Sequence, residues 1–210
     1  MSFYGFAKGL VSGVCHLLFR IKVVGTENIP TNESFVICAN HKSDFDPIMV
    51  AISMPVELNF MAKEELFRIK PIAKIIGALG AFPVKRGKSD VGALKSAISI
   101  LKSGGRLVIF PEGRRSPKTH MGEGKGGAVL IAVKSGVNIL PVGINGKYGL
   151  FSKITVNIGK PLDLSQYCGT KVDSETIKSI TDERLMPEIS LLSGVPTYAE
   201  AVKKGICEIN

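Results

Sequence analysis

The chain has 210 residues, 45% of them hydrophobic and 21% charged, so its composition excludes a disordered protein and predicts one globular domain with a substantial core. Its formal net charge is +9, and residues 85–125 alone hold ten Lys/Arg against three Asp/Glu. Because the positive charge is concentrated there, the sequence favours a local anion-binding site over a uniformly basic surface.

The chain begins with a segment that has the pattern of an amphipathic helix. Its large apolar residues recur at steps of three and four, and its polar residues step by four along another side: Phe3, Phe6, Leu10, Val14, Leu17 and Ile21 against Lys8, Ser12, His16 and Arg20. This pattern is typical of a helix that lies in a membrane interface with its cations at the lipid headgroups. A helix packed on the protein's own core explains it equally well. No apolar run reaches the ~18 residues needed to span a bilayer.

Strand-like runs rich in Val, Ile and Phe alternate with helical patterns along the rest of the chain. The predicted strands are residues 20–25, 34–39, 57–61, 81–85, 106–110, 138–144 and 153–158. The predicted helices are residues 46–54, 64–78, 89–103 and 125–135, followed by a helical tail from residue 173 that is broken near Pro187 and Pro196. The alternation predicts a single α/β domain in which helices flank a mostly parallel central sheet. Ligands of such sheets bind beyond the carboxyl ends of the strands, where three polar clusters fall.

The first polar cluster, residues 40–46, directly follows the predicted strand 34–39. Pro47 is favoured at the first position of a helix, so we expect Asp46 to be the N-cap residue. The turn is short enough for the Asp46 carboxylate to reach one imidazole nitrogen of His41, which leaves the other nitrogen free. Such a pair can take a proton from a substrate hydroxyl without a protein nucleophile. The alternative is that Asp46 only caps the helix and His41 is an ordinary loop residue.

Two further clusters place cations at strand ends. Arg86 lies near the end of residues 80–87, and Glu112 and Arg115 lie within residues 110–116. A guanidinium group donates two parallel hydrogen bonds to a phosphate, so these arginines are candidates for a phosphate site. Glu112 could orient either arginine or accept a hydrogen bond from a substrate hydroxyl. Taken singly, each arginine could equally be a solvated surface charge, and Glu112 an ion-pair partner.

The cysteines and histidines indicate no other chemistry. The four cysteines lie far apart without a Cys-x-x-Cys pair, so neither a disulfide framework nor a zinc site is indicated. The three histidines lack a metal-ligand spacing such as His-Glu-x-x-His, and we expect no metal and no cofactor. The chain has no Trp and most of its Phe residues lie in apolar patterns, which disfavours a nucleic-acid-binding module.

Taken together and in this order, the polar clusters resemble the sequence blocks of the glycerolipid acyltransferases, the family that includes bacterial 1-acylglycerol-3-phosphate acyltransferase. The first block, His-x4-Asp with its flanking residues, is matched by Asn40, His41, Ser43 and Asp46, the second by Gly80, Phe82 and Arg86, the third by Phe110, Pro111, Glu112, Gly113, Arg115 and Ser116, and the short apolar fourth by Leu140, Pro141 and Val142. The likeness covers roughly residues 20–160.

The resemblance implies a role for each matched position. In that family the histidine is the general base and the aspartate orients it, and these roles fall on His41 and Asp46. The phosphate of the acyl acceptor is bound by residues of the second and third blocks. The phosphate-binding set implied for this chain is Arg86, Glu112, Gly113, Arg115 and, more weakly, Lys63.

The implied activity is transfer of a fatty acyl group from acyl-carrier protein or acyl-CoA to the sn-2 hydroxyl of 1-acyl-sn-glycerol-3-phosphate, giving phosphatidic acid. The implied partners are lysophosphatidic acid, one of these donors and a membrane surface, with no nucleic acid. We expect residues 1–19 to be a membrane-associating helix and residues 20–210 the acyltransferase domain, held peripherally at the cytoplasmic face of the cell membrane. Glycerol-3-phosphate or another lysolipid as acceptor is one alternative, and a non-catalytic lipid-binding protein is the other.

Two departures from the family pattern concern the acceptor site. Position 114 is usually Thr in the family and is Arg here, which adds charge beside the expected phosphate site. Residues 122–127 keep only Lys125 where the family commonly has a Phe and two cations. These differences leave the acceptor preference open.

Overall fold

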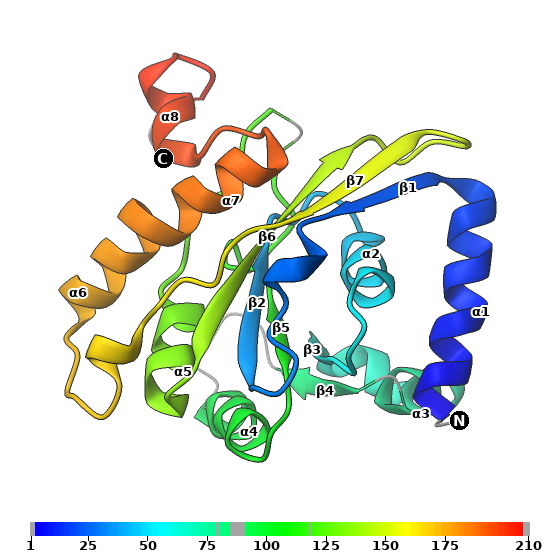
Figure 1. Ribbon diagram of the computed structural model, residues 1–210, viewed down its shortest axis with the longest axis horizontal. Helices are drawn as coiled ribbons and strands as arrows, with labels where there is room; N and C mark the ends of the chain where they lie inside the picture. Colours follow the sequence, from blue (N-terminus) through cyan, green and yellow to red (C-terminus); the bar gives the residue numbers. More distant parts are fainter. Residues whose placement is uncertain (1–2, 79, 85–90, 118, 208–210) are drawn as a thin grey trace.

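The computed structural model describes residues 3–78, 80–84, 91–117 and 119–207 (Figure 1). In these residues seven strands form one sheet in the order β1-β7-β6-β2-β5-β3-β4, and their bounds are β1 Arg20–Val24, β2 Phe35–Ala39, β3 Asn59–Lys63, β4 Ala81–Val84, β5 Leu107–Ile109, β6 Asn138–Gly146 and β7 Lys153–Ile158. Neighbouring strands are parallel except β6 and β7, which are antiparallel. The predicted α/β domain with a mostly parallel sheet is confirmed.

The helices agree with the predicted ones except at two places. Their bounds are α1 Phe3–Leu18, α2 Asp46–Ser53, α3 Lys70–Ala78, α4 Val91–Lys102, α5 Gly127–Ser135, α6 Ser174–Ser179, α7 Met186–Ser193 and α8 Tyr198–Lys203. The single helix predicted over 64–78 begins instead as a 3-10 turn, Glu64–Arg68. The predicted break at Pro187 is wrong, because a π-helical segment, Ile180–Leu185, joins α6 to α7 directly. Pro187 is the second residue of α7 and follows this wider helical segment within the continuous run.

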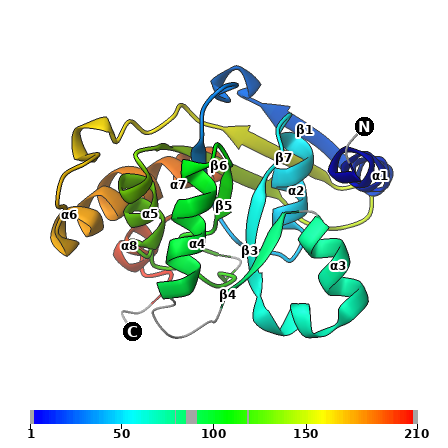
Figure 2. The same ribbon diagram turned by 90° about the horizontal axis from the view of Figure 1, so that it is seen from below.

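Different helices cover the two faces of the sheet (Figures 1 and 2). Successive side chains of β2 point to opposite faces, so Val36 and Cys38 pack with α4 and α5 while Phe35 and Ile37 pack with α1 and α2. Every residue of β2 is buried, as expected for an interior strand of a parallel sheet. The core therefore consists of two apolar layers, one on each side of the sheet.

The loops after β2, β5 and β6 converge at one edge of this sheet. Strand β2 lies between β5 and β6 and is parallel to both, with Cys38 beside Ile109 and Pro141. Because neighbouring parallel strands end at the same edge, the polar residues that follow each of them are brought together there.

Helix α1 packs on the protein's own core through one side. The Tyr4 hydroxyl accepts a hydrogen bond from the Leu58 N–H at 3.1 Å, and Cys15 is buried in the apolar layer beside α2. The Lys8 ammonium donates a hydrogen bond to the Met54 carbonyl. The sequence pattern predicted that Lys8 faces lipid headgroups. This prediction is wrong, because its ammonium is bonded to the protein.

The other side of α1 carries exposed apolar side chains, here called the α1 apolar row: Phe6, Leu10, Val14 and Leu17, which are 50–74% exposed. Of the remaining residues in the predicted apolar face, Ile21 lies in β1 and is half-buried, and the side chain of Phe3 lies outside the described part. None of the helices in the described residues is long and apolar enough to cross a membrane. Helix α1 thus combines a core-packed side with an unpartnered apolar one.

Candidate active site

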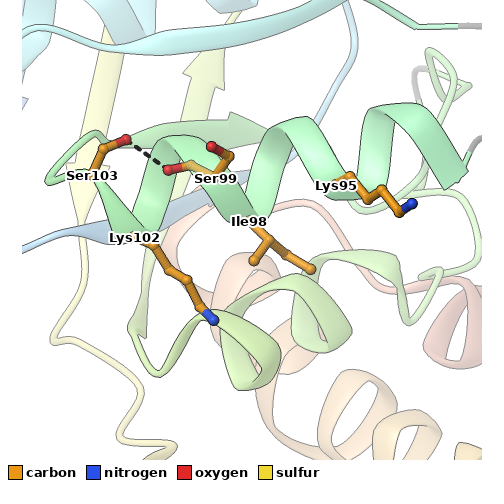
Figure 3. Close-up of a pocket in the computed structure, with 5 residues that line it drawn as sticks. All are labelled: Lys95, Ile98, Ser99, Lys102 and Ser103. Atoms are coloured by element: carbon orange, nitrogen blue, oxygen red, sulfur yellow. Dashed lines mark hydrogen bonds between the residues drawn. The ribbon is translucent and has the colours of Figure 1, made fainter.

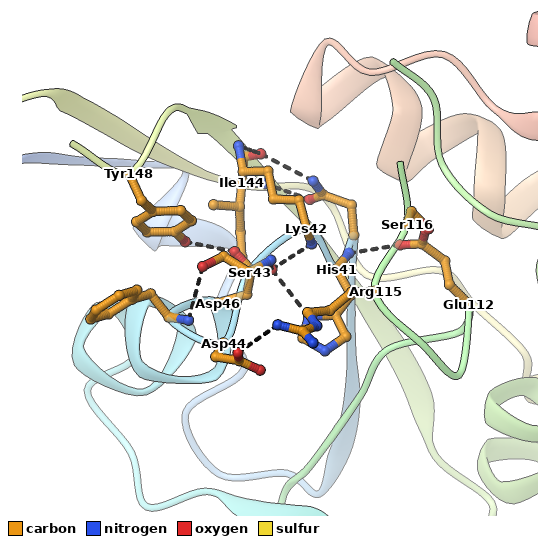
Figure 4. A network of polar contacts seen from close by, with 12 residues as sticks. His41, Lys42, Ser43, Asp44, Asp46, Glu112, Arg115, Ser116, Ile144 and Tyr148 are labelled. Carbon is orange, nitrogen blue, oxygen red and sulfur yellow. Dashed lines mark hydrogen bonds and ion pairs between the residues drawn. The ribbon is translucent and has the colours of Figure 1, made fainter. Parts of the chain in front are cut away.

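The imidazole of His41 and the carboxylate of Asp46 meet at the end of β2, as the sequence predicts (Figure 4). Nδ1 of His41 lies 3.1 Å from Oδ2 of Asp46, whose side chain is fully buried, whereas the His41 side chain is 11% exposed. Since an ionised carboxylate can only accept hydrogen bonds, Nδ1 carries the proton in the neutral ring. The ring also stacks on Phe110 at a centroid distance of 4.2 Å, which fixes its plane. The opposite nitrogen, Nε2, is left to act as an acceptor.

Asp46 holds the turn in shape, although not as the N-cap that the sequence predicts. It is the first residue of α2, Phe45 occupies the N-cap position, and no side chain caps the helix. The carboxylate points back into the turn instead, where Oδ2 accepts hydrogen bonds from the backbone N–H groups of Lys42 and Ser43, both at 2.6 Å. The backbone of the turn and the imidazole are therefore oriented by the same oxygen atom.

Tyr148 completes this network and was missed by the sequence analysis. Its hydroxyl donates a 2.6 Å hydrogen bond to Oδ1 of Asp46, and its ring packs against Phe19 and Phe45. Burial and the neighbouring Asp46 carboxylate raise the pKa of Tyr148 well above its usual range, so the phenol stays protonated and remains a donor. Tyr148 follows β6, and a polar residue just beyond a buried strand was the signal that could have identified it.

Two polar side chains next to His41 attach the turn to β6. Asn40 exchanges hydrogen bonds with the backbone of Ile144, as an acceptor at 2.7 Å and as a donor at 3.1 Å. The Lys42 ammonium donates to the carbonyl oxygens of Ile144 and Gly146 at 3.0 and 2.6 Å. Burial lowers the pKa of Lys42, partly offset by the Asp46 carboxylate. These contacts fix the distance between the His41 turn and the loop that carries Tyr148.

Glu112 joins the loop after β5 to the histidine turn through its carboxylate. Oε1 accepts a 2.6 Å hydrogen bond from the His41 N–H and Oε2 accepts a 2.7 Å bond from the Gly122 N–H. The side chain is 3% exposed, and burial raises the pKa of Glu112 to about 7 although both backbone bonds oppose the shift. The ion pair with Arg115 that the sequence left open is not formed, because Arg115 pairs with Asp44 instead.

The expected phosphate ligands are only partly described. Arg115 lies close to the histidine turn, with Nη1 at 2.6 Å from Oδ2 of Asp44, and both side chains are largely exposed. Gly113 has a positive φ of 69°, which favours glycine, and lies against the side chain of Lys125. Arg86 lies outside the described residues, and of Lys63 only the backbone, at the end of β3, is described. The exposed ion pair between Arg115 and Asp44 contributes at most about 1 kcal/mol to the stability of the fold, so Arg115 can readily exchange Asp44 for another anion.

Hollows in the described part of the chain include one beside the site and one away from it. A small one of about 20 Å³ lies beside the site and is lined by polar groups that include His41, Glu112 and His120, so it suits one water molecule. A larger and very open one of about 480 Å³ lies on the outer side of α4 between Lys95 and Lys102 (Figure 3). Its lining includes none of the residues discussed above, and the candidate site remains the edge of β2, β5 and β6.

The sequence and the fold of this chain are similar to those of a known group of proteins. The family described as Acyltransferase matches residues 20–145, more than half of the chain, from β1 to nearly the end of β6. The matched segment contains all four sequence blocks named above. The chain belongs to the acyltransferase family.

Individual relatives show how far the similarity extends. A 1-acyl-sn-glycerol-3-phosphate acyltransferase of Streptococcus pneumoniae is 34% identical over 202 residues, which are 90% of this chain and 73% of that protein. The protein of the same name from Bacillus subtilis is 31% identical over 170 residues, 78% of this chain and 84% of its own. The crystal structure of the 1-acyl-sn-glycerophosphate (LPA) acyltransferase PlsC from Thermotoga maritima superimposes with a TM-score of 0.67 at 28% identity, covering 90% of this chain and 81% of that one.

The raised pKa of Glu112 predicts a pH-dependent stability. A carboxyl group whose folded-state pKa of about 7 exceeds its ordinary 4.5 stabilises the fold fully at low pH and loses that contribution as the pH rises through 7. The change is on the order of 3 kcal/mol. We expect the free energy of unfolding of the wild type, measured in urea and taken relative to Glu112→Gln, to fall between pH 5 and pH 7.5. The control is Glu123→Gln, which changes an exposed neighbour: the free energy of unfolding of the wild type relative to this variant should not fall over the same pH range. If the free energies of unfolding of the wild type and of Glu112→Gln change in parallel with pH, the account is contradicted.

Proposed function

We propose that this chain transfers a fatty acyl group from a thioester donor to the sn-2 hydroxyl of 1-acyl-sn-glycerol-3-phosphate, which gives phosphatidic acid. The observation that carries the proposal is the His41–Asp46 contact at the carboxyl end of β2, where Nδ1 lies against a buried carboxylate and no described residue bonds to Nε2. The names of the relatives support lysophosphatidic acid as the acceptor. The donor is acyl-carrier protein or acyl-CoA.

His41 acts as the general base in the proposed reaction. Nε2 takes the proton from the acceptor hydroxyl, and the oxygen attacks the carbonyl carbon of the thioester. Asp46 stabilises the imidazolium that forms and keeps the ring in the productive tautomer. When the tetrahedral intermediate collapses, the carbon–sulfur bond breaks and the imidazolium returns the proton to the thiolate. The acceptor oxygen is the nucleophile throughout, so no acyl-enzyme is formed.

The phosphate of the acceptor is proposed to bind the cations beside this pair. Arg115 is exposed and bonded only to an exposed carboxylate, Asp44, among its described contacts. A dianionic phosphate can therefore displace Asp44 and take both donors of the guanidinium fork. Arg86 and Lys63 are proposed as further ligands on the basis of their positions in the sequence blocks. Glu112 is proposed to position the histidine turn, because its carboxylate accepts a 2.6 Å hydrogen bond from the backbone N–H of His41.

The enzyme is proposed to work peripherally at the cytoplasmic face of the cell membrane, with residues 1–19 as the associating helix and residues 20–210 as the acyltransferase domain. Both the acceptor and the product are lipids, so the site must approach a bilayer. The α1 apolar row supports this placement, because four large side chains there are at least half exposed on a helix whose other side is packed. Immersion of such side chains in the interface stabilises the bound state.

The function is tested by replacing the proposed base. We expect His41→Ala to lower kcat about 10²- to 10⁴-fold, the usual contribution of a positioned general base, while the protein remains folded by thermal unfolding. The assay offers lysophosphatidic acid, other lysolipids and glycerol-3-phosphate with each of the two donors and identifies the acylated position. A wild type that prefers glycerol-3-phosphate contradicts the acceptor assignment. A His41→Ala variant with near-normal turnover contradicts the mechanism.

The phosphate site is tested by Arg115→Ala. This change should raise KM for the acceptor at least about tenfold with little effect on KM for the donor, because a charge-assisted bond to the phosphate is lost. Asp44→Asn should not weaken acceptor binding, since it removes the group that competes for Arg115. Lys134→Ala, which removes an exposed cation at the end of α5, is the matched control. Equal losses for donor and acceptor in Arg115→Ala would show that the residue serves both substrates or the fold.

The position of Tyr148 predicts that it acts through His41. Tyr148→Phe leaves Oδ1 of Asp46 without its 2.6 Å donor, and we expect kcat to fall about tenfold with KM little changed. In the His41→Ala background the same change should have almost no effect on kcat, because the group that Tyr148 orients is already gone. Additive effects of the two substitutions refute an action through the histidine and point to a purely structural contribution.

A further inference from the structure

The loop between β6 and β7, residues 147–152, exposes two large apolar side chains next to each other. Leu150 is 68% exposed and Phe151 is 59% exposed. Two adjacent residues of this kind at the tip of a hairpin form an apolar projection, which becomes a candidate interaction site where it joins a larger exposed apolar patch. Tyr148 belongs to the same loop, but its side chain points inward to Asp46.

The backbone of this loop is held in a shape that keeps both side chains outward. Phe151 is the only non-glycine residue in the described part of the chain with a positive φ, 57°, a conformation that costs a bulky residue free energy. The Ser152 N–H donates to the Gly149 carbonyl at 3.0 Å, and the Ser152 hydroxyl lies 2.5 Å from the Lys147 carbonyl oxygen. Polar atoms thus close the loop from inside while the apolar side chains stay in solvent. A loop selected only for folding would gain from Gly or Asn at position 151.

The loop is attached to the end of α1. The Phe151 N–H donates to the Leu18 carbonyl at 2.7 Å, and the Arg20 N–H donates to the Ser152 carbonyl at 2.9 Å. Figure 1 shows the tip of the β6–β7 hairpin beside the upper end of α1. Leu17, the last and most exposed member of the α1 apolar row at 74%, precedes this junction directly. The row and the loop tip are therefore joined through the backbone at the end of α1, and together they are here called the apolar strip.

The segments that form this strip carry charge of one sign. Residues 1–26 and residues 124–162, which supply α1, β1, β6 and β7, contain no Asp or Glu at all. Four cations near the strip are exposed: Arg20, Lys22, Lys147 and Lys153. Arg20 and Lys153 are register partners in neighbouring strands, so like charges stand side by side there without an acidic partner within these segments. An apolar strip bordered by cations matches a bilayer that contains anionic lipid, in which the headgroups meet the cations.

We infer that the Leu150–Phe151 tip is a second membrane-inserting element, which enters an anionic lipid bilayer together with the α1 apolar row. This inference rests on the proposed function, which requires a membrane-borne acceptor. The same loop carries Tyr148, whose hydroxyl donates to Asp46, on its inner side. Insertion of the tip therefore places the His41 site at the lipid interface, within reach of an acceptor that remains in the bilayer.

The absence of Trp from the sequence allows a direct test. Phe151→Trp places a single fluorophore at the tip, and Leu191→Trp places one on α7, where Leu191 is 78% exposed on the opposite side of the sheet, as the matched control. Vesicles of equal parts phosphatidylglycerol and phosphatidylcholine are added without acceptor or donor. We expect the tryptophan emission of the Phe151→Trp variant to shift to the blue and to be quenched strongly by lipids brominated in the acyl chain. Neither change is expected for the Leu191→Trp variant.

A second pair of variants measures the contribution of the tip to binding. Leu150→Gln with Phe151→Asn, in which Asn tolerates the positive φ, should lower the vesicle partition coefficient at least about tenfold, and Leu191→Gln should leave it unchanged.

Two results would overturn the inference. One is a vesicle-bound Phe151→Trp variant whose tryptophan remains open to aqueous acrylamide. The other is a blue shift of the same variant that appears without lipid and grows with protein concentration. That result would show that a second copy of the chain covers the tip. Because no substrate is present, these outcomes are independent of the acyl-transfer assay, which tests the proposed function separately.

Discussion

The carboxylate of Asp46 is the point on which the arrangement of the site depends. It is completely buried, and burial of an unpaired carboxylate is strongly unfavourable. Four donors compensate for this: the backbone N–H groups of Lys42 and Ser43, the His41 ring and the Tyr148 hydroxyl. Hydrogen bonds to a charged group contribute about 1.5–3 kcal/mol each, so the turn, the imidazole and the β6–β7 loop are organised around one buried charge. Removing any one donor leaves the others less well oriented.

The sheet order explains why these donors meet. Strand β2 lies between β5 and β6, so the histidine turn is flanked by the Glu112 loop on one side and the Tyr148 loop on the other. Glu112 holds the His41 N–H, and Asn40 and Lys42 hold the end of β6. The imidazole is thus positioned from both neighbouring strands, and no described residue bonds to its Nε2. A base that is held rigidly at a strand end keeps its orientation when the lipid acceptor binds, which favours the geometry needed for proton transfer.

The sequence predicts those parts of this arrangement that depend on neighbours in the chain. The strands follow from their apolar runs, and the His41–Asp46 contact follows from a five-residue turn between a strand and a helix. Tyr148 could not be found in this way, because it lies 102 residues from Asp46 and reaches it only through the placement of β6 beside β2. The periodicity of α1 likewise shows two sides without showing that the Tyr4 side packs and the Phe6 side is exposed. Arg86 stays a prediction, since it lies outside the described residues.

The central claim is that the buried Asp46 carboxylate holds the neutral His41 ring with the proton on Nδ1 and Nε2 bare. The ¹⁵N chemical shifts of the ring nitrogens report this directly, in uniformly labelled protein at a pH where imidazole side chains are neutral. His16 and His120 are distinguished from His41 by comparison with His41→Gln. The account predicts that Nδ1 of His41 resonates as a protonated nitrogen and Nε2 as an unprotonated one, and that Asp46→Asn abolishes this preference. A wild-type ring with its proton on Nε2 would contradict the account, because the nitrogen that must accept the hydroxyl proton would already carry one.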